Sequence, residues 1–237
     1  MNAATIKKEL FALSDPQKKE FLPYFFKTGK GQYGEGDQFI GVVVPLQRQL
    51  VKKYNTLDFN EIALLLTDPY HECRLTGLLF LVQMFNKSKD LAFRKTIYDF
   101  YIAHVDYINN WDLVDLSARD IVGGYLWSQS KEALLEYAKS GHLWLQRISM
   151  IATYYFIKKN DFEYTFKVSD ILITHSHDLI HKVTGWMLRE VGNINHQALE
   201  DYLLYEKRYA KMPRTMLRYA IEKFEETERQ AFLKGLK

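Results

Sequence analysis

The segment INNWDLVDLSARDIVGG, residues 108–124, places a tryptophan and two carboxylates within five positions. In a helix, Asp115 shares a face with Trp111, because side chains four residues apart are neighbours. A fixed carboxylate beside an aromatic ring suits a reaction that develops positive charge, since the carboxylate stabilises that charge as it appears. Asp112 has a simpler explanation, because Asn110 is a suitable N-cap and a negative charge is favoured in the first turn.

Asp115 also has a purely structural explanation, an ion pair with Arg119 one turn further on. Such a pair stabilises a helix by only about 0.2–0.5 kcal/mol. The ion pair would not explain why the carboxylate faces Trp111. The sequence leaves both interpretations open.

A second group of side chains lies in HKVTGWMLREVG, where Lys182, Trp186 and Arg189 are spaced to share one helix face. A ring between two cations suits a surface that holds phosphates and lays the ring on a sugar or base. The alternative is that Trp186 is a packing residue. Gly185 weakens the helix by about 1 kcal/mol relative to alanine, so we expect another part of the protein to approach the helix closely at this residue.

Helical patterns dominate the elements that must position these residues, because most segments carry apolar residues at three- and four-residue spacing. Only FIGVVVP (39–45) resembles a strand. The aromatic stretch LPYFFK (22–27) is predicted to lie in the core, with a cationic end. The breaks are short and none resembles a flexible linker, so we expect one continuous domain over residues 1–237.

Four segments of the chain align with one another: HECRLTGLLFLVQMF, LWLQRISMIATYYFI, DLIHKVTGWMLREVG and RTMLRYAIEKF. Each carries a cation at the matching position, at intervals of 73, 35 and 36 residues; these are Arg74, Arg147, Lys182 and Arg218. The first interval spans two units, and the helix of residues 108–124 supplies the missing one. Helix pairs repeating every 35–40 residues or so are typical of HEAT-like repeats. The predicted fold is all-α, a right-handed solenoid of HEAT-like helix pairs with a concave basic surface.

We call these four cations the basic row. Equivalent positions in stacked repeats point the same way, so the row can meet the regularly spaced phosphates of a polyanion. Alternatively, each cation pairs with a nearby acid or lays its aliphatic stem on apolar surface. The formal net charge of +3 permits a nucleic-acid partner without requiring one.

Several other kinds of site are excluded by composition and spacing. Cys73 is the only cysteine, which rules out an internal disulfide or a cysteine-based zinc site and fits a reducing compartment. The spacing of His175, His177 and His181 matches no common zinc pattern, and GKGQYG (29–34) lacks the strand that precedes a dinucleotide-binding loop. No metal or cofactor is predicted. We see no signal-peptide core or membrane-length apolar run, so we expect a cytoplasmic protein.

Three motifs, WDLVD, WLQR and HKVTGW-LRE, resemble those of the AlkD-type DNA alkylation repair family, the HEAT-like-repeat DNA glycosylases. YGEGDQFIGVVVP and RTMLRYAIEKF resemble further family segments, so the resemblance spans nearly the whole chain. It implies that Asp115 is the catalytic carboxylate and that Trp111 and Trp186 contact the sugar of the damaged nucleotide. Arg147 would belong to the same active site. The predicted contacts with the DNA are Lys182, Arg189, Arg74, Arg214 and Arg218.

The resemblance implies a monofunctional glycosylase that releases N3- or N7-alkylated purines, such as 3-methyladenine and 7-methylguanine, from double-stranded DNA. It further implies that the concave surface cradles the duplex and that the damaged base is not flipped into a pocket. The chain would act as a monomer, without a cofactor, a membrane or an obligate protein partner. Two alternatives are a non-catalytic protein that binds bent or branched DNA and a HEAT scaffold for a protein partner. Asp115, Trp111 and Trp186 separate the enzyme from the binding-only protein, because a carboxylate within a basic row would only weaken DNA binding.

Overall fold

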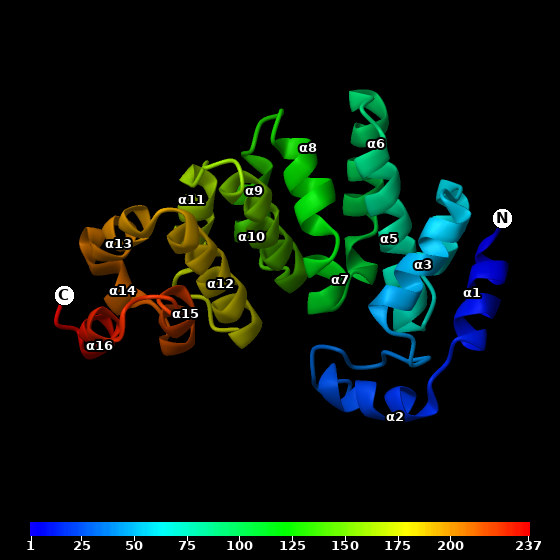
Figure 1. Cartoon of the computed structure of the whole chain (residues 1–237), viewed down its shortest axis with the longest axis horizontal. Helices are drawn as coiled ribbons and strands as arrows, with labels where there is room; N and C mark the ends of the chain where they lie inside the picture. The colour runs from blue at the N-terminus through cyan, green and yellow to red at the C-terminus, as the bar shows by residue number, and fades with distance from the viewer. The chain divides into compact units, whose positions relative to one another are not determined.

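The computed structural model describes all 237 residues, and its regular elements are helices (Figure 1). It contains no strand; one isolated parallel bridge joins Gln38 and Tyr70. The all-helical class predicted from the sequence is therefore confirmed. The chain divides into two compact units, residues 1–121 and residues 122–237. None of the helices combines the length and the apolar character needed to cross a lipid bilayer.

Unit 1 (residues 1–121) is built around the helix α5. Its elements are α1 (Ala3–Ala12), α2 (Pro16–Phe25), α3 (Val44–Tyr54), α4 (Phe59–Leu66), α5 (His71–Lys87), α6 (Leu91–Ala103), the 3-10 turn η1 (Val105–Tyr107) and α7 (Trp111–Asp115). Of the 17 residues of α5, 14 are buried, and the helix packs against α1, α3, α4, α6 and α7. A helix buried on all sides must be surrounded by other elements, so α5 organises the core of this unit.

Carboxylates begin three helices of unit 1. Asp15, Asp58 and Asp90 are the N-caps of α2, α4 and α6, and each side chain accepts a hydrogen bond from the backbone N–H two residues further on. Pro16 takes the first position of α2, where the helix needs no N–H donor. The starts of these helices are therefore encoded by adjacent residues.

The prediction of a strand at residues 39–45 is wrong. The backbone N–H groups of Ile40, Gly41 and Val42 donate to the Glu72 carboxylate of α5, at 2.9, 2.7 and 3.2 Å, instead of to a neighbouring strand. Gly41 has a φ of +94°, and a Cβ there would overlap the backbone of α2's N-terminal turn. The apolar pattern correctly indicates burial of this segment, but a side chain supplies its hydrogen-bond acceptor.

Unit 2 (residues 122–237) is a succession of helices. A π-helical turn, η2 (Arg119–Gly123), leads into α8 (Gly124–Leu126), α9 (Ala133–Lys139), α10 (Leu143–Ile157), α11 (Glu163–Leu172), α12 (Asp178–Ile194), α13 (His196–Leu204), η3 (Tyr205–Lys207), α14 (Arg208–Lys211), α15 (Arg214–Ala220) and α16 (Glu226–Lys234). The long helices α10 and α12 pack against each other, and α12 also packs against α13 and α15 (Figure 1).

The structure contains the close approach predicted at Gly185, where helix α15 packs against helix α12. A Cβ at this position of α12 would overlap the Met216 carbonyl oxygen and the Tyr219 side chain of α15. Glycine therefore lets the backbones of two helices approach each other. The four aligned segments of the sequence also each begin a helix in the structure, namely α5, α10, α12 and α15.

Candidate functional site

The motif WDLVD forms the whole of α7. Asn110 is its N-cap, as predicted, and the side-chain oxygen accepts a hydrogen bond from the Trp111 N–H at 2.8 Å. Trp111 and Asp115 are the first and last residues of this helix and lie one turn apart. Both side chains are half-buried, so neither is sealed in the core. Unit 1 therefore presents a ring and a carboxylate on one short helix.

The ring of Trp111 is held by the C-terminal end of α2. It stacks on Phe26, with ring centroids 5.3 Å apart, and meets the edge of Phe25 at 5.8 Å. Such aromatic pairs favour offset-stacked or edge-on geometry, and both are present here. The tryptophan is thus fixed from one side and partly accessible from another.

Asp112 belongs to a buried polar network that sequence analysis missed. One carboxylate oxygen accepts from the Leu113 N–H at 2.9 Å, as expected for the first turn, and the other lies 2.8 Å from His71 Nε2. His71 Nδ1 lies 3.2 Å from an Asp37 oxygen. Burial disfavours a charged imidazole, but the Asp112 charge and the hydrogen bonds to both carboxylates outweigh it and raise the pKa of His71 to about 9.

Arg74 completes this network and is not a surface cation. Only 4% of the residue is exposed, and its guanidinium pairs with Asp37 at 2.6 Å and donates to the carbonyls of Asp68 and Pro69. Burial disfavours the ionised Asp37 carboxylate, yet the His71 hydrogen bond and the Arg74 charge hold its pKa below the usual value. The predicted DNA contact of Arg74 is therefore corrected: the side chain neutralises a buried acid.

In unit 2, the predicted active-site residues Arg147 and Trp186 lie on the adjacent helices α10 and α12. Arg147 is 5% exposed, and its guanidinium donates to the Leu179 carbonyl at the start of α12 at 2.8 Å. Trp186 is half-buried, and its indole N–H donates to Glu190 at 3.1 Å. The two residues thus stand on packed helices, with Trp186 partly open to solvent.

The sequence matches a family model described as DNA alkylation repair enzyme over residues 6–224. The chain belongs to the DNA alkylation repair enzyme family. A solved structure from Enterococcus faecalis, described as a predicted DNA alkylation repair enzyme, has a similar fold, with a TM-score of 0.67 at 16% identity. The similarity covers 89% of this chain and 96% of that one. Among curated proteins, none matches this sequence.

In this member of the DNA alkylation repair family, several predicted DNA-contacting cations already have partners. Lys182 pairs with Asp178 at 2.7 Å, and Arg189 pairs with Glu222. Arg214 is exposed and donates to the Leu233 carbonyl. Arg218 is also exposed and forms no ion pair. The predicted alternative for the basic row, in which a cation pairs with a nearby acid, therefore applies to Arg74 and Lys182. Arg189, outside the row, is paired as well.

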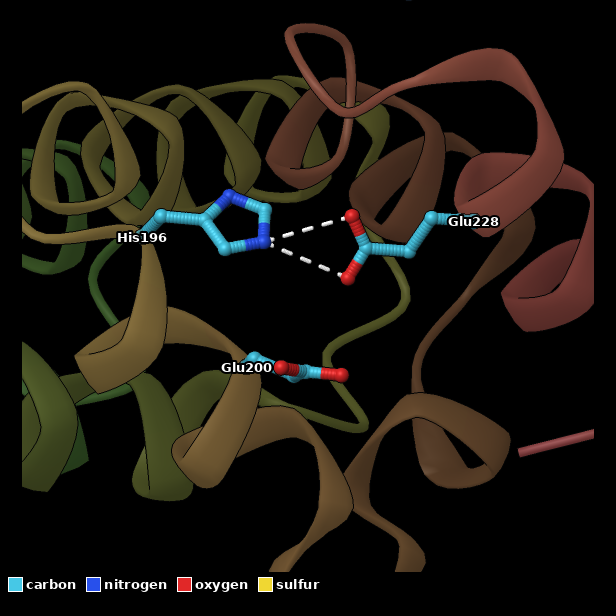
Figure 2. A group of neighbouring side chains, drawn as sticks. All are labelled: His196, Glu200 and Glu228. Carbon is cyan, nitrogen blue, oxygen red and sulfur yellow. Dashed lines mark hydrogen bonds and ion pairs between the residues drawn. The ribbon is translucent and has the colours of Figure 1, made fainter.

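Three potential metal-binding side chains gather in unit 2 of this repair-family protein: His196 and Glu200 of α13 and Glu228 of α16. Figure 2 shows the His196 imidazole facing the Glu228 carboxylate, with Nε2 3.2 Å from both oxygens. The Lys237 ammonium lies 2.7 Å from Glu200 and 3.8 Å from Glu228. Because that cation already lies between the two acids, the cluster joins α13, α16 and the C-terminal residues.

Proposed function

We propose that the protein is a monofunctional DNA glycosylase that hydrolyses the N-glycosidic bond of cationic N3- or N7-alkylated purines in duplex DNA. 3-Methyladenine and 7-methylguanine are the proposed leaving bases. The observation that carries the proposal is the placement of Asp115 one turn from Trp111 on α7, with both side chains half-buried. Membership of the DNA alkylation repair enzyme family supports the choice of substrate.

The chemistry follows from the charge of the damaged base. Alkylation at N3 or N7 makes the purine cationic, so the base leaves as a neutral molecule and needs no strong general acid. Positive charge then develops on the sugar, as in other glycoside hydrolyses with oxocarbenium-like transition states. The Asp115 carboxylate stabilises this charge and orients the attacking water. Trp111 adds cation–π attraction to the sugar, and the family resemblance gives Trp186 the same role.

The remaining residues bind the duplex in this proposal. The family resemblance assigns Arg147 to the active site, and the phosphates are held by Lys182, Arg189, Arg214 and Arg218. Lys182 and Arg189 exchange their present acidic partners for phosphates, which keeps each cation paired. Arg74 is not included, because its guanidinium is buried against Asp37.

The proposed frame for this site is a right-handed solenoid of HEAT-like helix pairs whose concave basic surface cradles the duplex. The lesion stays at this surface instead of entering a pocket. A single copy of the chain is sufficient for such a cradle, and the reaction needs no cofactor. The helical character of both units and the fold shared with the Enterococcus faecalis protein support this frame.

The test is release of alkylated bases from methylated duplex DNA, measured by mass spectrometry for the wild type, Asp115→Asn and Asp99→Asn. Asp99 is an exposed acid that pairs with Lys95 and serves as the matched control. We expect Asp115→Asn to lower the release rate by about 100-fold or more, as when other groups that stabilise transition-state charge are removed. Duplex binding should be unchanged or tighter, since a negative charge has been removed.

Equal release by the wild type and Asp115→Asn would reject the catalytic role of this carboxylate. Duplex binding without any release by the wild type would favour the non-catalytic DNA-binding alternative.

A further inference from the structure

Helix α2 has an exposed aromatic face that the sequence pattern did not predict. None of its ten residues is buried, and the exposed fractions of Phe21, Tyr24 and Phe25 are 60%, 77% and 50%. The predicted burial of LPYFFK (22–27) is therefore wrong, except for Phe26, which is 7% exposed. Neighbouring large apolar side chains on a surface commonly mark a binding site.

These rings continue to the candidate active site within unit 1. Phe21 stacks on Phe25 with centroids 6.1 Å apart, and Phe25 meets Trp111 edge-on at 5.8 Å. A row of three rings therefore runs from the middle of α2 to the first residue of α7. A ligand that reaches Trp111 in unit 1 has aromatic surface beside it.

A hollow of about 660 Å³ lies on the side of α2 that carries Tyr24. The turn that follows α2 forms its other wall, because Lys27 adopts a left-handed φ of +56° and reverses the chain. The lining includes the Tyr24 side chain and the cations Lys19 and Lys27. Both lysines are exposed and neither forms an ion pair, while Glu20 contributes one negative charge to the same lining.

We propose that this hollow binds one unpaired nucleotide of a DNA strand, with the base on the Tyr24 ring and the phosphate at Lys19 and Lys27. Every base has a π-face that stacks on an aromatic side chain, and ammonium groups hold phosphates. The net charge of the hollow, +1 after Glu20, favours an anionic ligand over an apolar peptide. The inference rests on the proposed function only in taking DNA as the partner.

The unpaired nucleotide can come from two sources, a single strand or a duplex in which one nucleotide has no partner. Binding of fluorescein-labelled 12-nucleotide single strands, matched duplexes and duplexes with a one-nucleotide bulge distinguishes them. Fluorescence anisotropy gives Kd for each DNA. Because only an unpaired base is free to stack on the Tyr24 ring, we expect the bulged duplex to bind about tenfold more tightly than the matched one.

The decisive variants are Tyr24→Ala and Tyr24→Phe, with Tyr107→Ala as the control at an exposed tyrosine elsewhere in unit 1. Tyr24→Ala should weaken binding of the bulged duplex about tenfold, the value of stacking one base on an aromatic ring. Tyr24→Phe keeps the ring and should bind like the wild type. Photocrosslinking from 5-iododeoxyuridine placed in the bulge should label Tyr24, as identified by peptide mass spectrometry.

The phosphate contact is tested by Lys19→Gln combined with Lys27→Gln, against Lys89→Gln, an exposed lysine without an ion pair. The double variant should bind the bulged duplex with a weaker salt dependence. The slope of log K against log salt should become smaller by about 0.9 for each phosphate that the protein no longer neutralises. The control should keep the wild-type slope. All these side chains are exposed, so circular dichroism should show unchanged folding.

Unchanged bulge binding by Tyr24→Ala overturns the inference, as does an equal weakening for matched and bulged duplexes. A concentration-dependent dimer that Tyr24→Ala abolishes, with DNA binding intact, would assign the face to a second copy of the chain. If the wild type releases alkylated bases while Tyr24→Ala binds every DNA normally, only this inference fails. If the wild type neither binds DNA nor releases bases, the proposed function itself fails.

Discussion

The imidazole of His71 lies between two carboxylates, Asp37 and Asp112, with the Arg74 guanidinium on the far side of Asp37. Two acids and one arginine leave the network with a negative charge unless the imidazole is protonated. Its pKa is raised from 6.5 to about 9 for this reason. The stabilisation that comes from His71 is therefore complete below pH 6.5 and is lost as the pH rises through 9.

We expect the free energy of unfolding to fall by at most about 3 kcal/mol between pH 6.5 and pH 9, because each pKa unit corresponds to about 1.4 kcal/mol. Urea denaturation at intervals across this range measures it. His71→Gln should be less stable than the wild type at pH 6 and nearly independent of pH above it. His196→Gln, at an exposed histidine, should retain the wild-type trend; a flat wild-type profile would contradict the assignment.

Residues close in sequence were predicted better than residues joined across the fold. The Asn110 cap follows from the preference of asparagine for that position, and the shared turn of Trp111 and Asp115 follows from helix periodicity. His71 stands 41 positions from Asp112, and no pattern of neighbouring residues indicates that the two side chains meet. The burial of Arg74 was missed for the same reason, because its partner Asp37 lies 37 positions away.

At the scale of elements, helix α12 depends on a glycine for its contact with α15. Gly185→Ala should destabilise the protein by roughly 2–4 kcal/mol, because the added methyl group meets the Met216 carbonyl and the helices must separate. Thermal unfolding followed by circular dichroism measures this destabilisation. Gly192→Ala is the matched control in the same helix, since its Cβ meets the terminal methyl of Leu199, a side chain that can rotate.

A Gly185→Ala protein as stable as Gly192→Ala would show that α12 and α15 adjust to the extra methyl group without destabilisation.

The contact predicted at this glycine illustrates what a sequence can reveal about helix packing. A residue that weakens a helix within an otherwise regular pattern indicates a structural requirement at that position. Residues 39–43 and helix α2 show what an apolar pattern cannot predict. Apolar patterns indicate burial, yet they specify neither the Glu72 acceptor of residues 40–42 nor the exposure of the aromatic rings of α2.

At the scale of the whole molecule, 32 basic residues against 29 acidic ones leave little net charge to attract DNA. Affinity for duplex DNA should therefore depend on a few local phosphate contacts. Arg218→Gln should reduce the slope of log K against log salt by about 0.9, the change for one phosphate contact. Lys182→Gln should change the slope less, because Lys182 gives up the Asp178 pair on binding. Binding titrations at several salt concentrations measure both slopes.

The control for these titrations is Lys89→Gln, which should leave the slope unchanged. Absence of any salt-dependent DNA affinity in the wild type would favour the scaffold alternative, in which the helices bind a protein.

The lack of buried side chains in α2 has a consequence for how the protein can change over generations. Substitutions at Phe21, Tyr24 or Lys19 leave the packing around α5 untouched, so they alter contacts with ligands at little expense in stability. The core residues of α5 have no such freedom. Descendants of this chain can therefore diversify what they recognise through one short helix while inheriting the rest of the unit intact.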